Sequence, residues 1–255
     1  MIRTIGILGG KGMLGSDLVK FLGKDFETTA IDKDNYKDYL GQKFDVLINA
    51  NGNSRRFWAN EHPLEDFEAS TVSVYKSFFD FSFKKYIYIS SPDVYENPGD
   101  PESAKENQNI SASHLSHYGF HKYLSERLVE HYAKDYLIIR PASLLGDGLK
   151  KGVVYDILND AALFVAAESQ IQFISTSEVV NTIQALITGG IKNEIFNVAG
   201  RGAVLVSRIA ELARKCLSVK SDAEEQQYEM SVGKIEELFP VKTSEEYLGE
   251  FLSGK

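Results

Sequence analysis

Short apolar runs rich in β-branched side chains alternate with amphipathic segments along most of the chain. Strands that are apolar on both faces are typical of a parallel sheet covered by helices on each side. The pattern therefore predicts an α/β fold with a doubly wound parallel sheet. The expected strands are residues 4–9, 27–32, 45–50, 85–90, 136–141, 171–175 and 194–199, and the expected helices are residues 13–23, 61–82, 114–133, 152–162, 176–188 and 205–218.

Two segments depart from this alternation. Residues 91–113 form one long polar connection rich in Pro, Asn and Ser. A loop of this length inside a compact domain is more often functional than idle. Residues 206–255 lose the strand rhythm and predict a small helical cap around "SVGKIEELF" and "SEEYLGEFL".

Three glycines, Gly9, Gly12 and Gly15, follow the first expected strand and open the first expected helix. Gly9 permits a tight turn, Gly12 lets the backbone approach a pyrophosphate, and Gly15 lets the helix pack against the strand. The first helical residues, Met13 and Leu14, belong to a helix N-terminus that faces the negative charge. The context favours a dinucleotide site, and hence a Rossmann-type sheet, over a turn that merely needs glycine.

The second expected strand ends in Asp32. A carboxylate at this point could bind the adenosine ribose hydroxyls and would repel a 2′-phosphate, although it could also be a surface acid at a strand end. The neighbouring Lys33 makes the preference for NAD over NADP only slight. We therefore expect NAD or NADP as the cofactor, with NAD slightly favoured.

Several motifs occur together in one order: the glycine turn, "INANG", "ISSPDVY" and Tyr118-x-x-x-Lys122, followed by "IIRPASLLGDG", "FISTSEVVNTIQAL" and "EIFNVAG". In this order they resemble the extended short-chain dehydrogenase/reductase family, and most closely its nucleotide-sugar branch of epimerases, dehydratases and 4-keto-sugar reductases. The resemblance runs from residue 2 to about residue 215. It implies a dinucleotide-binding domain of residues 1–148 plus about 171–200. It also implies a small, mostly helical C-terminal substrate lobe of about 149–170 and 201–255.

The chain also departs from the family. Only residues 33–44 separate Asp32 from the next expected strand, so one strand and one helix usual in the family look trimmed. Ser70 stands where the family usually has an asparagine, and Glu178 where it often has an aspartate. These differences concern details of the site rather than the fold.

Tyr118 and Lys122 lie four residues apart in "HYGFHKYLSER", so they share one face of an expected helix. A tyrosine near its reference pKa of about 10 transfers protons poorly at neutral pH, and a nearby ammonium lowers that pKa. The alternative is a chance pair on a solvated helix face. The glycine turn and the serine strand favour the catalytic interpretation, and the resemblance implies that Lys122 also binds the nicotinamide ribose.

Ser91 stands where the family has its substrate-orienting Ser or Thr, at the carboxyl end of an expected strand. Ser90 would point to the opposite face of the strand, and both serines could instead simply end the strand. Asp93 is either a substrate contact or a turn former. Pro92 replaces one acid of the dehydratase motif, which disfavours a 4,6-dehydratase.

The remaining site residues come from two loops after strands. The loop "NANGNSRRFW" should lie beside the cofactor, and its Arg55 and Arg56 could clamp a diphosphate or carboxylate, or pair with the acids of residues 61–68. The further residues expected at the cofactor are Asn49, Ala50, Gly52, Ser90, Arg140 and Pro141, and those expected at the substrate are Asp93, Arg55, Arg56 and Ser143.

Composition narrows the possible partners. The formal net charge of −8 on 255 residues argues against nucleic-acid binding. The single cysteine, Cys216, indicates a reducing compartment, and the expected strand near the N-terminus leaves no room for a signal peptide. No apolar run is long enough to span a membrane. We expect a soluble cytoplasmic protein without a metal site, since the histidines at 114, 117 and 121 lack a zinc-binding pattern.

These observations together predict a 4-keto-sugar reductase that uses Ser91, Tyr118 and Lys122 on a nucleotide-sugar. The runner-up is a nucleotide-sugar 4-epimerase that retains its NAD. A cofactor-binding sensor without catalysis, and an oxidoreductase for a non-sugar ketone, are further alternatives. The family resemblance also implies a homodimer formed through the Tyr–Lys helix and the helix before it.

Overall fold

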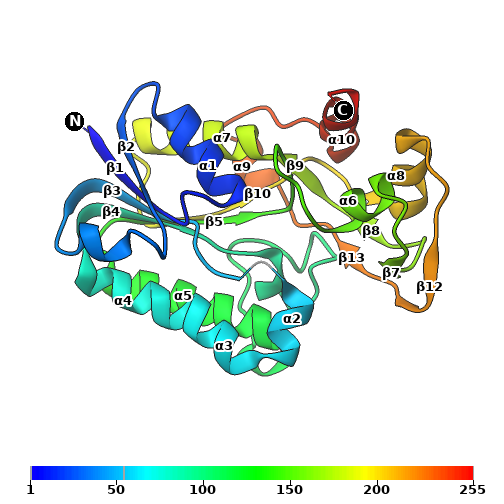
Figure 1. Ribbon diagram of the computed structural model, residues 1–255, viewed down its shortest axis with the longest axis horizontal. Coiled ribbons are helices and arrows are strands. Elements are labelled where there is room, and N and C mark those ends of the chain that lie inside the picture. The colour runs from blue at the N-terminus through cyan, green and yellow to red at the C-terminus, as the bar shows by residue number, and fades with distance from the viewer. Residues whose placement is uncertain (1, 54, 255) are drawn as a thin grey trace. The chain divides into compact units, whose positions relative to one another are not determined.

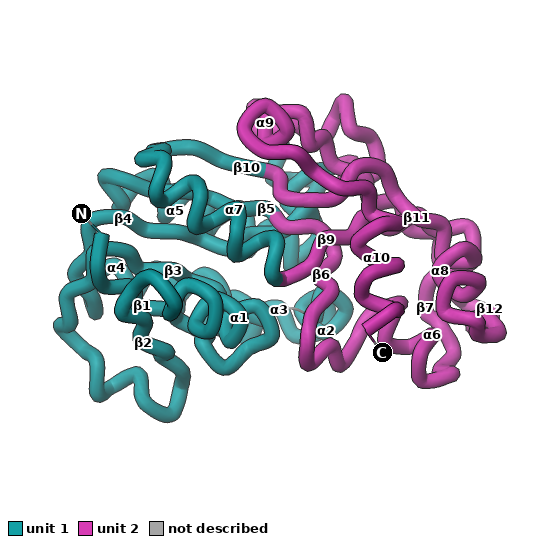
Figure 2. Tube along the Cα trace, turned by 90° about the horizontal axis from the view of Figure 1, so that it is seen from above, with its two compact units in different colours: residues 1–96, 109–140, 177–196 teal, residues 97–108, 141–176, 197–255 magenta. Residues whose placement is uncertain are grey.

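The computed structural model describes residues 2–53 and 55–254, which form two compact units (Figure 2). Unit 1 contains residues 1–96, 109–140 and 177–196, and unit 2 contains residues 97–108, 141–176 and 197–255. The predicted division into a cofactor domain and a substrate lobe stays a prediction.

The sheet of unit 1 has six strands in the order β10-β5-β4-β3-β1-β2, and the pairings among β1 to β5 are parallel. The predicted doubly wound, Rossmann-type fold is confirmed, and every expected strand except 171–175 lies in this sheet. The strand bounds are β1 Thr4–Leu8, β2 Glu27–Ile31, β3 Lys43–Asn49, β4 Ser82–Ile89, β5 Tyr136–Pro141 and β10 Glu194–Val198.

Helices cover both faces of the sheet (Figure 1). Helices α1 (Met13–Leu22) and α7 (Thr176–Thr188) lie on one face, and α4 (Ser73–Asp80) and α5 (His117–Tyr132) lie on the other. Side chains of the central strands are buried on both faces, which explains their nearly continuous apolar sequences. Aromatic residues fill the layer below α4 and α5, including Phe81 and Tyr86.

The segment expected as one helix over residues 61–82 is broken into pieces. Helices α2 (Arg56–Glu61) and α3 (Pro63–Phe67) meet at His62, because Pro63 cannot continue a helix that began before it. A π-helical turn, Glu68–Val72, then joins α3 to α4. Such turns are frequent at functional sites.

Unit 2 consists of short strands and helices. The strand expected over residues 171–175 is divided into β8 and β9, which pair within unit 2 instead of with the six-stranded sheet. The bounds are β6 Ser143–Leu145, β7 Leu163–Val165, β8 Gln170–Ile171, β9 Phe173–Ser175, β11 Val204–Leu205, β12 Val219–Glu224, β13 Gln227–Tyr228, α6 Val153–Leu158, α8 Val206–Ala213, α9 Gly233–Glu236 and α10 Ser244–Ser253.

The C-terminal part contains the two expected helices, α9 and α10, and α10 begins with a capping box of Thr243 and Glu246. It also contains β12 and β13, which the sequence did not predict. The sequence of β12, "VKSDAE", is polar and mostly exposed, so it lacks the apolar pattern of a strand. It pairs with β7 only because the tertiary fold brings the two together.

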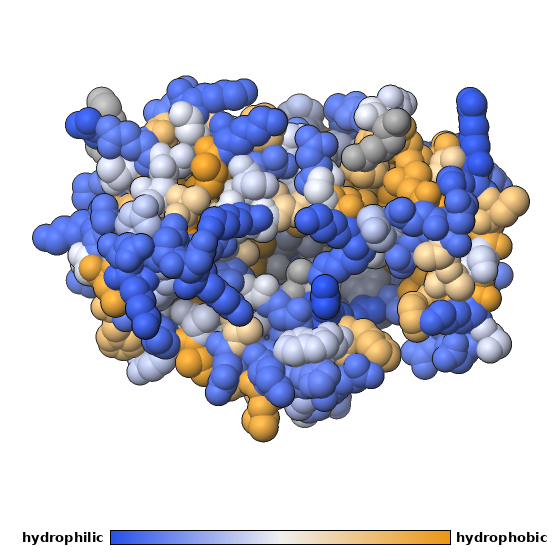
Figure 3. Space-filling model, viewed as in Figure 1, coloured by the Kyte–Doolittle hydropathy of each residue, from blue (hydrophilic) through white to orange (hydrophobic). Residues whose placement is uncertain are grey.

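The surface in Figure 3 is mostly hydrophilic, with hydrophobic residues in separate groups. Among the described residues, none of the helices is long and apolar enough to cross a membrane.

Candidate active site

The glycine turn has the geometry that the sequence predicts. Gly9 has a φ of +78°, and its N–H donates to the carbonyl of Ile31 at 2.8 Å. A Cβ atom on Gly15 would lie 1.9 Å from the Gly9 carbonyl oxygen, so only glycine lets α1 approach the turn this closely. Gly12 caps α1 without a side chain, which leaves the first-turn N–H groups, from Met13 and Leu14 onward, uncovered by a cap. The turn therefore fits a pyrophosphate.

Asp32 is fixed to this turn. Its Oδ2 accepts the backbone N–H of Lys11 at 3.0 Å, and its own N–H donates to Asn35 Oδ1 at 2.7 Å. The Lys11 ammonium pairs with Asp34 at the exposed surface. The Asp32 carboxylate thus stands at the carboxyl end of β2 beside the glycine turn, where a ribose diol would meet it.

The loop after β3 is shaped from within the core. The Asn49 side chain is fully buried, donates to the Tyr86 hydroxyl at 2.8 Å and accepts the N–H of Asn51 at 3.0 Å. Ala50 and Gly52 are half-buried instead. Asn49 therefore holds the loop in place, and the loop surface is formed by the residues that follow it.

Gly52 lies beside Lys122. It has a φ of +121°, and a Cβ atom on it would lie 3.5 Å from Ser70 Oγ and 3.8 Å from Lys122 Nζ. The loop after β3, the π-helical turn and α5 therefore converge at this glycine.

Ser91 follows β4 and caps the 3₁₀ turn Pro92–Val94. Its hydroxyl donates to Asp93 Oδ2 at 2.8 Å and accepts the Asp93 N–H at 3.3 Å. A Cβ atom on Gly119 would lie 2.1 Å from the Asp93 carbonyl oxygen, so glycine lets α5 pack directly on this turn. This approach brings Tyr118 near Ser91, whose hydroxyl acts to lower the pKa of the phenol.

Tyr118 and Lys122 are both buried, with 8% and 5% of their surfaces exposed. Lys122 Nζ donates to the Ile89 carbonyl at 3.0 Å and lies 5.1 Å from the ring centre of Tyr88. The structure thus brings Ser91, Tyr118 and Lys122 together at the carboxyl end of β4, where open α/β sheets bind their ligands.

Burial dominates the proton affinities of this trio. It raises the pKa of Tyr118 above its ordinary value, and the Asp93 charge adds to the rise while the Ser91 hydrogen bond opposes it. Burial also lowers the pKa of Lys122 to about 8, although nearby carboxylates oppose this fall. The Tyr–Lys spacing alone predicts a lowered pKa for the tyrosine. In the structure burial instead raises the pKa of Tyr118, which favours the neutral phenol.

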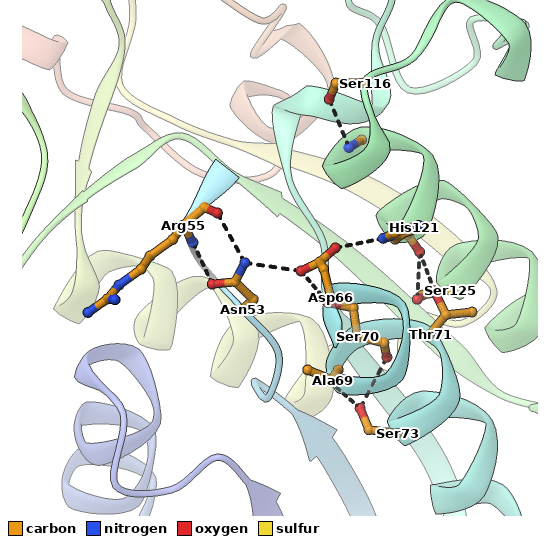
Figure 4. A network of polar contacts seen from close by, with 11 residues as sticks. Asn53, Arg55, Asp66, Ala69, Ser70, Thr71, Ser73, Ser116, His121 and Ser125 are labelled. Atoms are coloured by element: carbon orange, nitrogen blue, oxygen red, sulfur yellow. Dashed lines mark hydrogen bonds and ion pairs between the residues drawn. The ribbon is translucent and has the colours of Figure 1, made fainter. Parts of the chain in front are cut away.

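Asp93 has one of the two roles that the sequence left open, the turn, and its contact with a substrate stays a prediction. It forms the turn after Ser91, and its Oδ1 pairs with Arg56 Nη1 at 3.2 Å. Burial raises the pKa of Asp93, and the Arg56 charge opposes that rise. The Arg55 side chain is exposed and extends away from the polar network in Figure 4. Of the two arginines, Arg56 is the one beside the trio.

Ser90 points to a different set of partners. Its hydroxyl donates to Glu126 Oε1 at 2.5 Å, and Arg140 binds the same carboxylate with Nε and Nη2 at 2.9 and 2.7 Å. Arg140 also donates to the Tyr95 hydroxyl at 2.7 Å and is only 1% exposed. This buried bidentate ion pair fastens β5 to α5, so contact of Arg140 with a cofactor stays a prediction.

The two other expected residues of this strand end are placed differently. Pro141 is buried at the end of β5. Ser143 is exposed at the start of β6 in unit 2, where its N–H donates to the Gln172 carbonyl at 3.1 Å. Its contact with a substrate stays a prediction.

The sequence missed a buried network around Asp66. Its Oδ2 lies 2.6 Å from His121 Nδ1, and its Oδ1 accepts from Asn53 at 3.1 Å and from Ser70 at 3.4 Å (Figure 4). The spacing of Asp66, Ser70 and Val74, four residues apart, could have indicated a shared inner face. Among the described residues, no group of three His, Cys, Asp or Glu side chains could hold a metal ion.

A doubly wound sheet, a glycine turn after its first strand and a Ser–Tyr–Lys trio beyond β4 define an NAD(P)-dependent enzyme of the short-chain dehydrogenase/reductase type. The family model described as "NAD dependent epimerase/dehydratase family" matches residues 5–199. The chain belongs to this family, and the predictions of an enzyme and of an NAD or NADP cofactor are confirmed.

Solved structures share the fold at low sequence identity. A UDP-galactose 4-epimerase has a TM-score of 0.82 at 19% identity, over 98% of this chain and 97% of that chain. A dTDP-4-dehydrorhamnose reductase from Clostridium acetobutylicum has a TM-score of 0.79 at 19% identity, over 98% and 99%. A UDP-glucuronic acid 4-epimerase from Bacillus cereus, bound to UDP-glucuronic acid and NAD, has a TM-score of 0.80 at 16% identity, over 99% of both chains. No curated protein matches the chain in sequence.

Proposed function

We propose that the protein is a 4-keto-sugar reductase whose substrate is a sugar linked to a nucleotide. The observation that supports this best is the buried phenol of Tyr118, which lies near Ser91 and one helical turn from Lys122. Reduction of a ketone to an alcohol needs one hydride and one proton. A neutral phenol beside the reacting oxygen supplies the proton.

Each residue of the trio has a distinct task in this proposal. The dinucleotide, held by the glycine turn and by Lys122, supplies the hydride when bound. Ser91 turns its hydroxyl from Asp93 to the ketone oxygen and orients it. Tyr118 donates its proton to that oxygen, and the Lys122 ammonium stabilises the phenolate that remains.

Arg56 and Asp93 are proposed as substrate contacts, because both lie beside Ser91. A guanidinium that is one-third exposed can bind a diphosphate bidentately if Asp93 releases it. The similarity to enzymes of UDP- and dTDP-sugars supports a nucleotide-sugar as the substrate class.

A cofactor balance tests the reaction. The purified protein would be mixed with NADH or NADPH and a panel of nucleotide-linked 4-keto sugars, and the absorbance of the reduced cofactor followed. A reductase oxidises one NADH or NADPH for each sugar that it reduces. The Tyr118→Phe variant should be inactive. The matched control is Tyr123→Phe on the same helix, which should keep its activity.

The runner-up is a nucleotide-sugar 4-epimerase. Epimerases of UDP-galactose and UDP-glucuronic acid are among the similar structures and favour it, since the trio serves both reactions. An epimerase would retain bound NAD through purification and interconvert two sugars without net change in NADH. A sensor without catalysis would show neither result, and stabilisation by ketones but not by nucleotide-sugars would indicate a non-sugar substrate.

Asp32 is the basis for proposing NAD over NADP. Its carboxylate is fixed by the Lys11 N–H at the position where a 2′-phosphate would add negative charge. Comparing the affinities for NADH and NADPH, with Asp32→Asn as the variant, tests this preference. Loss of the Asp32 charge should narrow the difference between the affinities for NADH and NADPH.

We also propose a homodimer formed through α4 and α5. Tyr75, Phe79 and Tyr132 lie on these helices with 40%, 64% and 38% of their surfaces exposed, and their rings contact one another. Aromatic clusters of this kind are enriched in interfaces. The cytoplasmic location and the lack of nucleic-acid partners stay predictions.

A further inference from the structure

A carboxylate and an imidazole are buried together between α3 and α5, and the proposed reaction uses neither. Asp66 is 0% exposed and His121 is 5% exposed. The carboxylate receives hydrogen bonds from His121, Asn53 and Ser70, which belong to three separate segments (Figure 4). A buried charge is costly unless it is hydrogen-bonded in this way. The fold therefore places three hydrogen-bond partners around the Asp66 carboxylate.

The site adjoins Lys122. His121 precedes Lys122 in α5, and Ser70 Oγ and Lys122 Nζ both lie within 4 Å of a Cβ position on Gly52. Burial lowers the pKa of Lys122, and among the carboxylates that oppose this fall Asp66 has the largest effect. The Asp66 charge thus favours the ammonium form of Lys122.

The other two carboxylates near Lys122 have arginine partners. Glu126 is paired with Arg140, and Asp93 is paired with Arg56. The ion pairs of Asp66 within the described chain include His121 but no arginine or lysine. The other two donors to Asp66, Asn53 and Ser70, are uncharged, whereas a guanidinium compensates the charge of a carboxylate.

We propose that Asp66 is the counter-charge that keeps Lys122 protonated, and that His121, Asn53 and Ser70 hold its carboxylate in position. Asp66 and His121 are positioning residues, because they act on the reaction through Lys122. The inference rests on the proposed role of Lys122 in catalysis.

The surrounding charges define which substitutions are informative. The carboxylates that act on Lys122 are Asp66, Glu126 and Asp93, the Arg56 charge acts on the neighbouring Tyr118, and the His117 ring lies 6.3 Å from that of His121. Asp66→Asn removes one negative charge and keeps the size of the side chain. His121→Asn retains an N–H donor for Asp66, whereas His121→Phe removes the donor. The three variants separate charge from hydrogen bonding.

A titration of Lys122 itself tests the proposal on the protein as purified. Lysine labelled with ¹³C at Cε would be followed by NMR, and the Lys122 signal assigned by its loss in Lys122→Met. We expect a midpoint near 8, as the lowered pKa indicates. Asp66→Asn should move it down by about half a pH unit or more, since the neutral amine is then favoured. His121→Phe should move it in the same direction, and His121→Asn should leave it nearly unchanged.

A matched control is Asp135→Asn, which breaks the buried ion pair of Asp135 with Lys85 just before β5. It should lower stability without moving the Lys122 midpoint. A midpoint that stays in place in Asp66→Asn would overturn the proposal and leave Asp66 with a structural role. If Asp66→Asn does not fold, a folded His121→Phe variant with an unchanged midpoint has the same consequence.

Turnover gives the second readout. Where a keto-sugar substrate is found, the alkaline fall of kcat/KM should shift downward with the NMR midpoint, with little change in sugar KM at pH 7. If no keto-sugar is turned over, the proposed function fails. The NMR titration still decides the role of Asp66, so the two failures are distinguishable.

Discussion

Keeping the buried Lys122 side chain ionised is costly to the folded protein. Its pKa falls from 10.5 to about 8 because the side chain is buried. Between these two values the folded chain binds fewer protons than the unfolded chain, so stability rises with pH across this window. Below about pH 8 the full cost of the buried charge is present.

We therefore expect Lys122→Met to lose activity but to gain stability, because the cost of burying the ammonium outweighs its attraction to the nearby carboxylates, Asp66 included. Removing the buried charge should raise the free energy of unfolding at pH 7 by the order of 2 kcal/mol. The gain should shrink by about half at pH 9.5, where the wild-type lysine is neutral in the folded state. Urea unfolding at the two pH values measures both effects.

Lys85 provides the contrast for this experiment. It is equally buried, but it is paired with Asp135 and the Ile191 carbonyl. Lys85→Met should therefore lower stability at both pH values, because it removes the buried end of this ion pair and leaves the half-buried Asp135 with the exposed Lys192. A loss of stability in Lys122→Met at pH 7 would contradict our account of the site.

Gly15 offers a second prediction at the scale of one residue. A methyl group there would overlap the Gly9 carbonyl, at 1.9 Å. Gly15→Ala should weaken dinucleotide binding at least tenfold, because α1 must move away from the turn. Gly249→Ala, on α10 with open space around it, is the control and should bind normally. Isothermal titration with NADH measures both, and equal affinities would refute the assignment of the turn.

At the scale of elements, the position of α5 depends on its contact with the turn after β4. Gly119 allows this contact, since a Cβ atom would lie 2.1 Å from the Asp93 carbonyl oxygen. Gly119→Ala should push the start of α5 outward and separate Tyr118 from Ser91. We expect kcat to fall about 100-fold, as small misplacements of catalytic groups do, with melting temperature and cofactor affinity much less affected. Unchanged kcat would show that the contact does not position Tyr118.

The sequence predicted those elements that depend on local pattern. Strands β1 to β5 and the glycine turn follow from apolar runs and from the spacing of Gly9 and Gly15. The pair Tyr118 and Lys122 followed from helical spacing. Each of these signals lies within a few residues of chain, so no knowledge of tertiary contacts was needed.

The features that the sequence did not reveal depend on distant partners. The sequence did not reveal that the Arg140 guanidinium binds Glu126 on α5 in the core. Asp66 was one of the acids of residues 61–68 that could pair with Arg55 or Arg56, and only the approach of α5 buries it against His121. Strand β12 has no apolar pattern and forms because β7 lies beside it. Tertiary contacts override local propensity in such cases.

At the scale of the whole molecule, the exposed aromatic residues of α4 and α5 predict the assembly state. Phe79→Ser should convert a dimer into a monomer in sedimentation experiments, because it removes the most exposed ring of the cluster. Leu238→Ser, an exposed apolar residue of unit 2, is the control and should not change the mass. A wild-type protein that sediments as a monomer at all concentrations would refute the proposed dimer.

The position of β2 at the end of the sheet has a consequence for solubility. An edge strand offers backbone groups that can pair with another chain and start aggregation. Here the strand is only five residues long, Asn35 donates to its Ala30 carbonyl at 3.1 Å, and Glu27 is tied to Arg3 by an exposed ion pair. These features limit pairing with other molecules. The sheet edge at β2 is thus protected by the Arg3–Glu27 ion pair, by the short length of the strand and by the Asn35 side chain rather than by a further strand.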